Sequence, residues 1–151
     1  MKKTLTSILF ILFINTIYSQ KIEILDGKYY ESKKLYSGIL VEYYDNGQTK
    51  QETTILQGLL HGETKLYFQN KQIKEIRHFA NGKKEGIWIT YYENGKKQGE
   101  ASFKEDLKHG VWLIWDENGT KRYHMEYDKG NKVGKWLMWD ENGKLTQERT
   151  Y

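Results

Sequence analysis

Residues 112–119 are WLIWDENG and residues 136–143 are WLMWDENG, so the chain contains nearly the same eight residues twice, 24 residues apart. The same interval separates five glycines that open matching stretches of sequence. These repeat glycines are Gly38, Gly62, Gly86, Gly110 and Gly134. A fixed period of this length is the signature of a repeat protein, in which each unit packs on its neighbours.

Each repeat has the composition of a β-hairpin. Residues 87–92 are β-branched and aromatic, which favours an extended strand, and residues 97–103 return after Asn94-Gly95. Asn-Gly tolerates a positive φ at both positions, so it predicts a type I′ turn. Residues 104–109 then predict a wider turn into the next repeat. The Asn-Gly pairs are Asn46-Gly47, Asn94-Gly95, Asn118-Gly119 and Asn142-Gly143.

The repeats predict an all-β chain, an elongated antiparallel sheet of tandem hairpins over residues 38–151. The units are 38–61, 62–85, 86–109, 110–133 and the shorter 134–151. Lys71 follows Asn70 where the other copies have glycine, which predicts a strained or different turn. Residues 20–37 form a lead-in hairpin or cap with a possible turn at Asp26-Gly27.

The first 19 residues have the pattern of a secretory signal peptide. Lys2 and Lys3 precede a mostly apolar run from Leu5 to Ile17, and Ser19 is a small residue suited to a cleavage site before Gln20. The run is short for a membrane span. The sequence therefore predicts an exported chain, in the periplasm, at the cell surface or secreted, with no stable membrane span after cleavage.

Composition excludes some classes of partner and bond. Removal of Lys2 and Lys3 with the leader leaves 22 Lys and Arg residues against 20 Asp and Glu, and the small excess is scattered. A nucleic-acid surface would gather its cations on one face, so no nucleic acid is expected as a partner. There is no cysteine, and therefore neither a disulfide nor a lipid-modified cysteine.

Aromatic residues recur at the repeat interval in two registers. One ladder contains Tyr43, Tyr67, Tyr91, Trp115 and Trp139; the other contains Trp88, Trp112 and Trp136. Strand alternation puts the two ladders on opposite faces. Each could pack into a thin core, but a single-layer sheet leaves at least one uncovered, and exposed apolar surface marks a binding site. A third series at the ends of the return strands predicts a packed spine: Ile55, Phe79, Phe103, Tyr127 and Tyr151.

Catalytic and metal-binding patterns are weak. The four histidines have neither an i, i+4 histidine partner nor a neighbouring cysteine. Asp116-Glu117 and Asp140-Glu141 could suggest a calcium ladder, but aspartate also favours the start of a turn. We therefore expect no enzyme, no metal and no cofactor.

The repeated glycine, tryptophan, aromatic residue and Asn-Gly pair resemble the MORN-repeat variant family over residues 36–151, with the copy from Gly62 fitting worst. The chain also resembles antitoxin proteins of the YwqK type, which are built of such repeats. The resemblance implies an all-β array of hairpins without catalytic residues. It also implies protein–protein contact and, in eukaryotic relatives, membrane association.

Three functions remain open from the sequence. The first is an exported, non-catalytic repeat protein that presents an aromatic sheet face to a protein partner. The second is a module for a glycan or envelope polymer, which would place acidic and amide groups such as Glu93, Glu117 and Glu141 beside the aromatic rings. The third is an antitoxin that neutralises a partner toxin, which predicts a cytoplasmic location.

Overall fold

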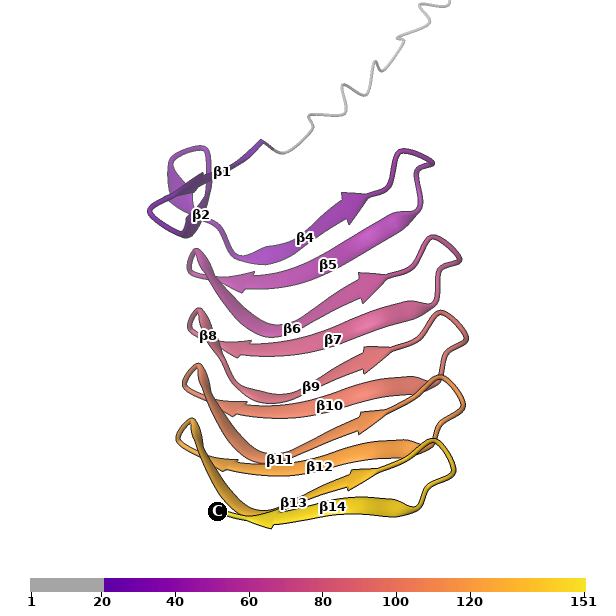
Figure 1. Cartoon of the computed structure of the whole chain (residues 1–151). Coiled ribbons are helices and arrows are strands. Elements are labelled where there is room, and N and C mark those ends of the chain that lie inside the picture. The colour runs from indigo at the N-terminus through magenta and orange to yellow at the C-terminus, as the bar shows by residue number, and fades with distance from the viewer. Residues whose placement is uncertain (1–20) are drawn as a thin grey trace, which may run out of the picture.

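The computed structural model describes residues 21–151, and this part of the chain is all-β (Figure 1). A small antiparallel sheet contains β1–β3, and the other strands form one long sheet in the order β14-β13-β12-β11-β10-β9-β7-β6-β5-β4, with β8 paired to β7. The small sheet consists of β1 (Ile22–Leu25), β2 (Lys28–Glu31) and β3 (Lys34–Leu35). The long sheet consists of β4 (Gly38–Tyr43), β5 (Thr49–Leu56), β6 (Leu59–Tyr67), β7 (Ile73–Ala80), β8 (Lys83–Lys84), β9 (Gly86–Tyr91), β10 (Lys97–Lys104), β11 (Leu107–Trp115), β12 (Lys121–Asp128), β13 (Asn131–Trp139) and β14 (Leu145–Thr150).

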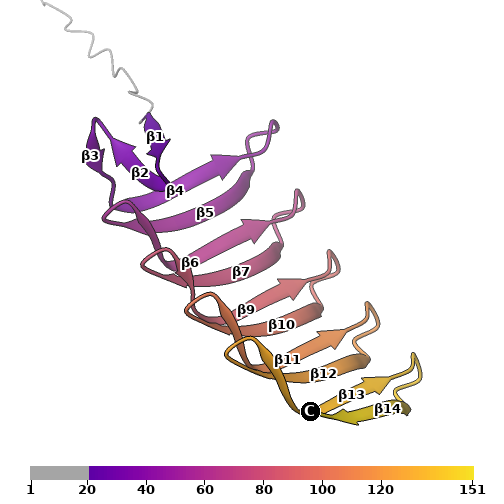
Figure 2. The ribbon, with the colours of Figure 1, turned by 60° about the vertical axis from the view of Figure 1, so that its left-hand side comes forward.

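The long sheet is a single curved layer, as Figure 2 shows from the side. Strands pair with their neighbours in sequence, so the predicted array of tandem antiparallel hairpins is confirmed. With no second layer, little is buried: the buried apolar side chains are Tyr36, Ile55 and Tyr127, and the buried polar ones are Thr53 and Thr64. The packing interactions of this fold therefore lie on the two faces of one sheet.

The Asn-Gly turns differ from the predicted type. The N–H of Gly95 donates to the carbonyl of Tyr92 over 2.9 Å, so the central residues are Glu93 and Asn94. Gly95 has a φ of 81°, whereas neither central residue has a positive φ. The prediction of a type I′ turn was therefore wrong, because glycine occupies the left-handed position after the turn, as in three-residue hairpin loops. Asn94 contributes its side chain, whose Oδ1 accepts the N–H of Lys96.

The turn between repeats is tight, and the prediction of a wider turn over residues 104–109 was wrong. Lys104 pairs directly with Leu107, so the loop has two residues, Glu105 and Asp106, with φ values of 48° and 70°. Positive φ at both loop positions defines a type I′ turn. The corresponding turns are Gln57-Gly58, Asn81-Gly82 and Lys129-Gly130. The Asn-Gly pairs at the other end of the hairpins had suggested the opposite arrangement.

The repeat glycines bend the outgoing strands. Gly62, Gly86, Gly110 and Gly134 have φ values between 63° and 74°, whereas Gly38 has an extended φ of 158°. In the β10–β11 pair, Ala101 faces Trp112 but Phe103 faces Lys108, so β11 contains two extra residues beside Gly110. An irregularity of this kind bends the strand. We call the hollow side of the curved sheet the concave face and the other side the convex face.

At each of the last three bends, a tryptophan side chain donates a hydrogen bond to a backbone carbonyl where the hydrogen bonding between the strands is interrupted. The indole Nε1–H of Trp112 donates to the carbonyl of Ser102 over 2.9 Å, within the stretch where the extra residues interrupt the ladder. Trp88 donates to the carbonyl of His78 over 2.9 Å, and Trp136 to that of Glu126 over 3.1 Å. A buried carbonyl without a partner is costly, so this indole is part of the fold.

The N-terminal unit docks on the first type I′ turn. Tyr29 N–H donates to the carbonyl of Gly58, and Gly58 N–H donates to that of Tyr36 over 2.7 Å. Gly58 has a φ of 75°, and a Cβ atom there would lie 3.0 Å from the carbonyl oxygen of Tyr29, so both the backbone conformation and the close approach favour glycine. Residues 21–37 thus contact one end of the first hairpin. The predicted turn at Asp26-Gly27 is present, with φ values of 49° and 72°.

The predicted leader falls on residues 1–19, which lie outside the described residues. Within residues 21–151, no helix is long and apolar enough to cross a membrane.

Candidate binding faces

An unbroken file of aromatic rings runs along the concave face. We call it the aromatic spine: it alternates ring by ring between return and outgoing strands, and neighbouring ring centroids are 4.9 to 5.3 Å apart. Its members in spatial order are Phe79, Trp88, Phe103, Trp112, Tyr127, Trp136 and Tyr151. The interplanar angles of 52° to 64° are tilted or edge-on, as aromatic pairs prefer. The tryptophan ladder and the return-strand series thus form one structure.

A lysine from each of repeats two to four lies over two rings of the spine. Lys108 Nζ is 4.5 Å from the Trp112 ring centroid and 4.8 Å from that of Tyr127. Lys84 lies 5.1 Å from both Trp88 and Phe103. Lys132 lies 4.5 Å from Trp136 and 5.0 Å from Tyr151. These distances are those of cation–π contacts, so the concave face combines apolar rings with positive charge.

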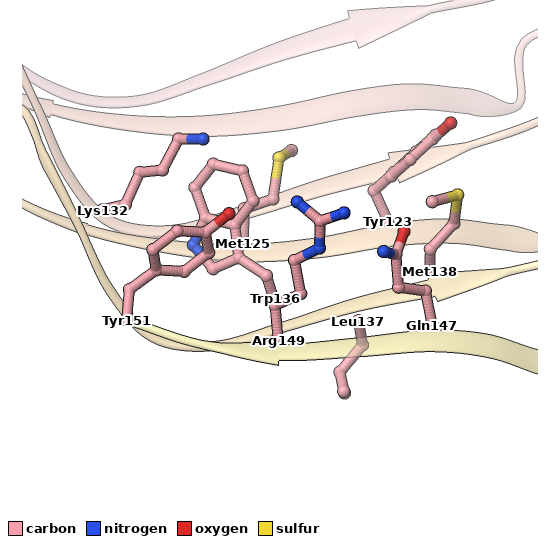
Figure 3. Close-up of a pocket in the computed structure, with 9 residues that line it drawn as sticks. All are labelled: Tyr123, Met125, Lys132, Trp136, Leu137, Met138, Gln147, Arg149 and Tyr151. Carbon is pink, nitrogen blue, oxygen red and sulfur yellow. The ribbon is translucent and has the colours of Figure 1, made fainter.

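The spine is open to solvent at its C-terminal end, where a hollow of about 270 Å³ lies over β12 to β14. In Figure 3, Lys132, Trp136, Arg149 and Tyr151 rise from the same side of the sheet, whereas Leu137 points the other way. A hydrogen bond from Arg149 and the charge of Lys132 hold the pKa of the Tyr151 phenol below its usual value. The hollow is therefore aromatic and cationic.

A second open stretch of the concave face lies over the middle repeats. Its lining includes the apolar residues Trp88, Phe103, Trp112 and Ile114, together with the polar residues Glu75, Thr90, Gln98 and Glu100. Ile114 keeps 38% of its surface exposed, as does Tyr123 in the C-terminal hollow. The two stretches share one face and one pattern of rings. Their shallow, elongated form suits a polymer segment better than a small ligand, which binds in a deep cleft.

The ladder of Tyr43, Tyr67, Tyr91, Trp115 and Trp139 lies on the convex face, so the predicted opposition of the two ladders agrees with the structure. Its rings do not form a file. Tyr43 is 61% exposed, and Tyr67 donates from its hydroxyl to Glu52 Oε2 over 2.9 Å. Lys97 covers Trp115 at 5.9 Å, and Lys121 covers Trp139 at 5.7 Å.

Paired charges cover the convex face beside this ladder. Lys65 lies 2.7 Å from Glu63, Lys97 lies 2.9 Å from Glu100, and Lys135 lies 2.7 Å from Glu148. The hydrogen bond to its glutamate raises the pKa of each of these lysines. The Tyr67 phenol has a raised pKa because burial and the hydrogen bond to Glu52 disfavour its ionisation.

Sequence reasoning found the aromatic residues but missed the concave lysines. Lys84, Lys108 and Lys132 stand 24 residues apart, so the same interval that revealed the glycines also marks them. Solvated lysines are common on repeat surfaces, and the interval alone did not show that these lysines lie over the rings.

The histidines and carboxylates of residues 21–151 form isolated pairs. His124 Nε2 lies 3.1 Å from Glu126, and His109 Nδ1 lies 3.2 Å from Asp128, which are isolated pairs. Within residues 21–151, no group of three or more His, Asp or Glu residues is placed to hold a metal ion. Asp116 and Asp140 each accept two backbone N–H groups in their turns, as the alternative to a calcium ladder predicted.

Comparison with known proteins agrees with the geometry. No curated protein matches the chain. A family model described as MORN repeat variant matches residues 36–56, 60–81, 84–105, 108–129 and 132–151. Each matched segment begins two residues before a repeat glycine, in agreement with the five repeats of the sheet. The chain belongs to the MORN repeat variant family.

Proposed function

We propose that this protein is a non-catalytic binding scaffold that presents the concave aromatic face of its sheet to a protein partner. The aromatic spine carries the proposal, since it is continuous over repeats three to five and no second layer formed by residues 21–151 covers it. Exposed apolar surface of this extent marks an interaction site, and Trp and Tyr are the residues that most often anchor protein interfaces. MORN repeats are associated with protein or membrane contact, which agrees with this role.

The scarcity of buried side chains supports the same proposal. Tyr127 is the only buried residue of the spine, and the three spine tryptophans are half-buried. A partner that covered these rings would remove apolar area from water, at about 25 cal/mol for each Å². Binding would therefore add the second layer that the sheet lacks.

The convex ladder is the less favoured binding face. Lys97 and Lys121 lie over the rings of Trp115 and Trp139. Lys97 also forms an ion pair with Glu100. A partner would have to displace these contacts before it reached the rings. The concave face is the one on which the structure supports a partner.

Site-specific photo-cross-linking tests the proposal. A benzoylphenylalanine at Ile114 would point from the concave side of β11, and one at Val111 would point from the convex side of the same strand; both residues are exposed. In cells of the native host, we expect protein adducts from position 114 and not from 111. Adducts from 111 alone, or from neither position, would contradict the proposal.

We also propose that the scaffold is exported, on the support of the leader pattern in residues 1–19. The N-terminal mass and cell fraction of natively expressed protein test this. A chain that begins at Gln20 outside the cytoplasm is expected. A chain that begins at Met1 in the cytoplasm would contradict export and favour the antitoxin role.

A further inference from the structure

Three lysines on each face of the sheet differ in their ion pairs. At the N-terminal end of the concave face, Arg77 lies 5.3 Å from the Trp88 ring centroid and pairs with Glu75 over 2.7 Å. The convex lysines Lys65, Lys97 and Lys135 each pair with a glutamate within 3 Å. The three lysines over the spine have no carboxylate within ion-pair distance anywhere in residues 21–151, and neither does Arg149.

Strand alternation explains the difference. The row that contains Glu100, Leu113, His124, Leu137 and Glu148 faces the convex side. The row that contains Ala101, Trp112, Met125, Trp136 and Arg149 faces the concave side. The paired residues of β9 to β14 that face the concave side include no carboxylate. From β9 to β14 the concave face is thus an aromatic groove with unpaired positive charge, whereas Glu75 of β7, paired with Arg77, lies at the N-terminal end of this groove.

The spacing of these charges restricts the shape of an anionic ligand. Each repeat contributes two strands, which lie about 4.8 Å apart, so successive lysines are separated by about 10 Å along the groove. A polyproline II helix has three residues per turn and rises about 3.1 Å per residue, so every third side chain recurs on one side after about 9 Å. In a β-strand, residues three apart point to opposite sides. The lysine spacing therefore matches a polyproline II segment with an acidic residue at every third position.

The rings suit the same ligand. Proline-rich segments in the polyproline II conformation dock in grooves lined by aromatic residues, because the extended helix is already ordered before binding. Here the rings tilt against one another, and the face that they line stays open to solvent at the C-terminal hollow. A glycan would need carboxylate and amide groups beside the rings. The acidic residues named from the sequence, Glu93, Glu117 and Glu141, lie in the hairpin turns at one end of the strands. Beside the rings the groove has the carboxylate of Glu75, which Arg77 already pairs, and the amides of Gln98 and Gln147.

We propose that the concave groove from β8 to β14 binds an extended acidic protein segment, in the polyproline II conformation, whose carboxylates meet Lys84, Lys108 and Lys132. This inference rests on the proposed protein-binding function and names the face and the chemistry of the partner. The segment would lie across the strands, parallel to the long axis of the sheet.

Synthetic peptides test the charge and the spacing. The probes are fluorescein-labelled (Pro-Pro-Glu)₆, the neutral (Pro-Pro-Gln)₆ and the isomer (Pro-Glu-Pro-Pro-Pro-Glu)₃, which has the same composition and a different spacing. Fluorescence anisotropy at low salt should show binding of the first peptide, at least tenfold weaker binding of the neutral peptide, and weaker binding of the isomer. Equal binding of all three would overturn the proposal.

Matched variants test the position. The triple variant Lys84→Gln, Lys108→Gln and Lys132→Gln should bind (Pro-Pro-Glu)₆ at least tenfold more weakly, since each solvent-exposed ion pair contributes a factor of a few. The convex triple variant Lys65→Gln, Lys97→Gln and Lys135→Gln should bind like the parent chain. An equal loss in both triple variants would show general charge attraction and overturn the proposal.

The lysines also contact the rings, so their removal could disturb the sheet. The variant with arginine at all three concave positions keeps the charge and the contact with the rings. It should bind within about threefold of the parent chain and thereby separate charge from folding. Loss of binding in a folded arginine variant would overturn the proposal. Tighter binding of polygalacturonate than of the peptide, with the same dependence on the concave lysines, would overturn it in favour of an anionic glycan.

The failure of this inference can be told from the failure of the proposed function. If position 114 cross-links to a protein segment that is not acidic, the scaffold role stands and the proposal of an acidic ligand is wrong. Absence of concave cross-links would remove the scaffold role itself.

Discussion

Lys71 occupies a position that glycine fills in the other four repeats. It has a φ of 70°, and its N–H donates to the carbonyl of Phe68 over 3.0 Å, so the turn keeps the geometry of its glycine counterparts. The expected strain is therefore present, whereas a different turn is not. A left-handed conformation costs a residue with a Cβ about 1–2 kcal/mol. Replacement of Lys71 by glycine would remove this cost. Part of the resulting stabilisation would be lost, because glycine has more conformational freedom in the unfolded chain.

We therefore expect Lys71→Gly to raise the free energy of unfolding by about 0.5–1 kcal/mol in urea denaturation. The control is the reverse change at the equivalent position of the next repeat, Gly95→Lys, which should lower it by a similar amount. If both changes shift stability in the same direction, the turn is not limited by its φ.

Thr64 stands where later repeats have Trp88 and its equivalents. It is 3% exposed, and its Oγ1 is buried without a hydrogen-bond partner. An unsatisfied buried hydroxyl costs about 1–3 kcal/mol. Because valine has nearly the same shape, Thr64→Val should stabilise the chain by about 1 kcal/mol.

Thr53 supplies the control for that change. It is as deeply buried as Thr64, but its Oγ1 accepts a hydrogen bond from Gln51 over 2.8 Å. Thr53→Val should therefore give no stabilisation. Thermal unfolding of both variants distinguishes the two cases. Absence of stabilisation in both variants would show that the hydroxyl of Thr64 has a partner in solution, and equal stabilisation in both would show that the hydrogen bond of Thr53 does not stabilise the chain.

At the scale of the hairpin, tryptophan joins the bend of one strand to the carbonyl of the strand before it. Trp112→Phe keeps a ring in the spine but removes the donor to the Ser102 carbonyl, so it should destabilise the chain by about 1–2 kcal/mol. Trp115→Phe on the convex face serves as the matched control, because no indole hydrogen bond of Trp115 is present in the described chain. It should cost less than Trp112→Phe in urea denaturation.

The order of the two destabilisations shows which aromatic ladder stabilises the fold. If Trp115→Phe proves the more damaging, the convex ladder is the structural one. The concave rings would then carry less of the fold, and the spine would no longer be its packing element.

The same hairpins show what the sequence could predict and what it could not. The period, the strand pairs and the opposition of the ladders follow from residue spacing and alternation, which are local properties. The turns were assigned to the wrong ends because Asn-Gly is compatible with both loop types, and the choice depends on strand register. Glu105-Asp106, with no glycine, adopts the type I′ turn because Lys104 and Leu107 pair directly.

The candidate site was predicted in the same partial way. Alternation places Trp112 and Trp115 on opposite faces, but it does not indicate which face is hollow. The bend at Gly110 decides that, and it depends on two extra residues in one strand relative to its neighbour. Only the folded register brings Lys108 over the ring of Trp112.

At the scale of the whole molecule, the sheet is a linear array in which each repeat contacts the next. The turns are in step as well: Gly82 N–H donates to the carbonyl of Leu60 and Gly130 N–H to that of Lys108, 22 residues earlier in each case. The stability of such an array is close to a sum of repeat and interface contributions. It should therefore tolerate removal of a whole repeat far better than removal of part of one.

Deletion of residues 86–109, one complete repeat, would join Glu85 directly to Gly110 and preserve the order of hairpins and turns. The shortened chain should keep its β-sheet circular dichroism and unfold cooperatively at lower urea concentration, because one unit and one interface are lost. Deletion of residues 86–97 removes only half as many residues but takes out one outgoing strand and its turn. It would reverse the direction of every later strand relative to its neighbour, so that the concave residues no longer share a face. The 12-residue deletion should therefore be the more damaging of the two. The opposite order of stabilities would mean that the array does not depend on the register of its repeats.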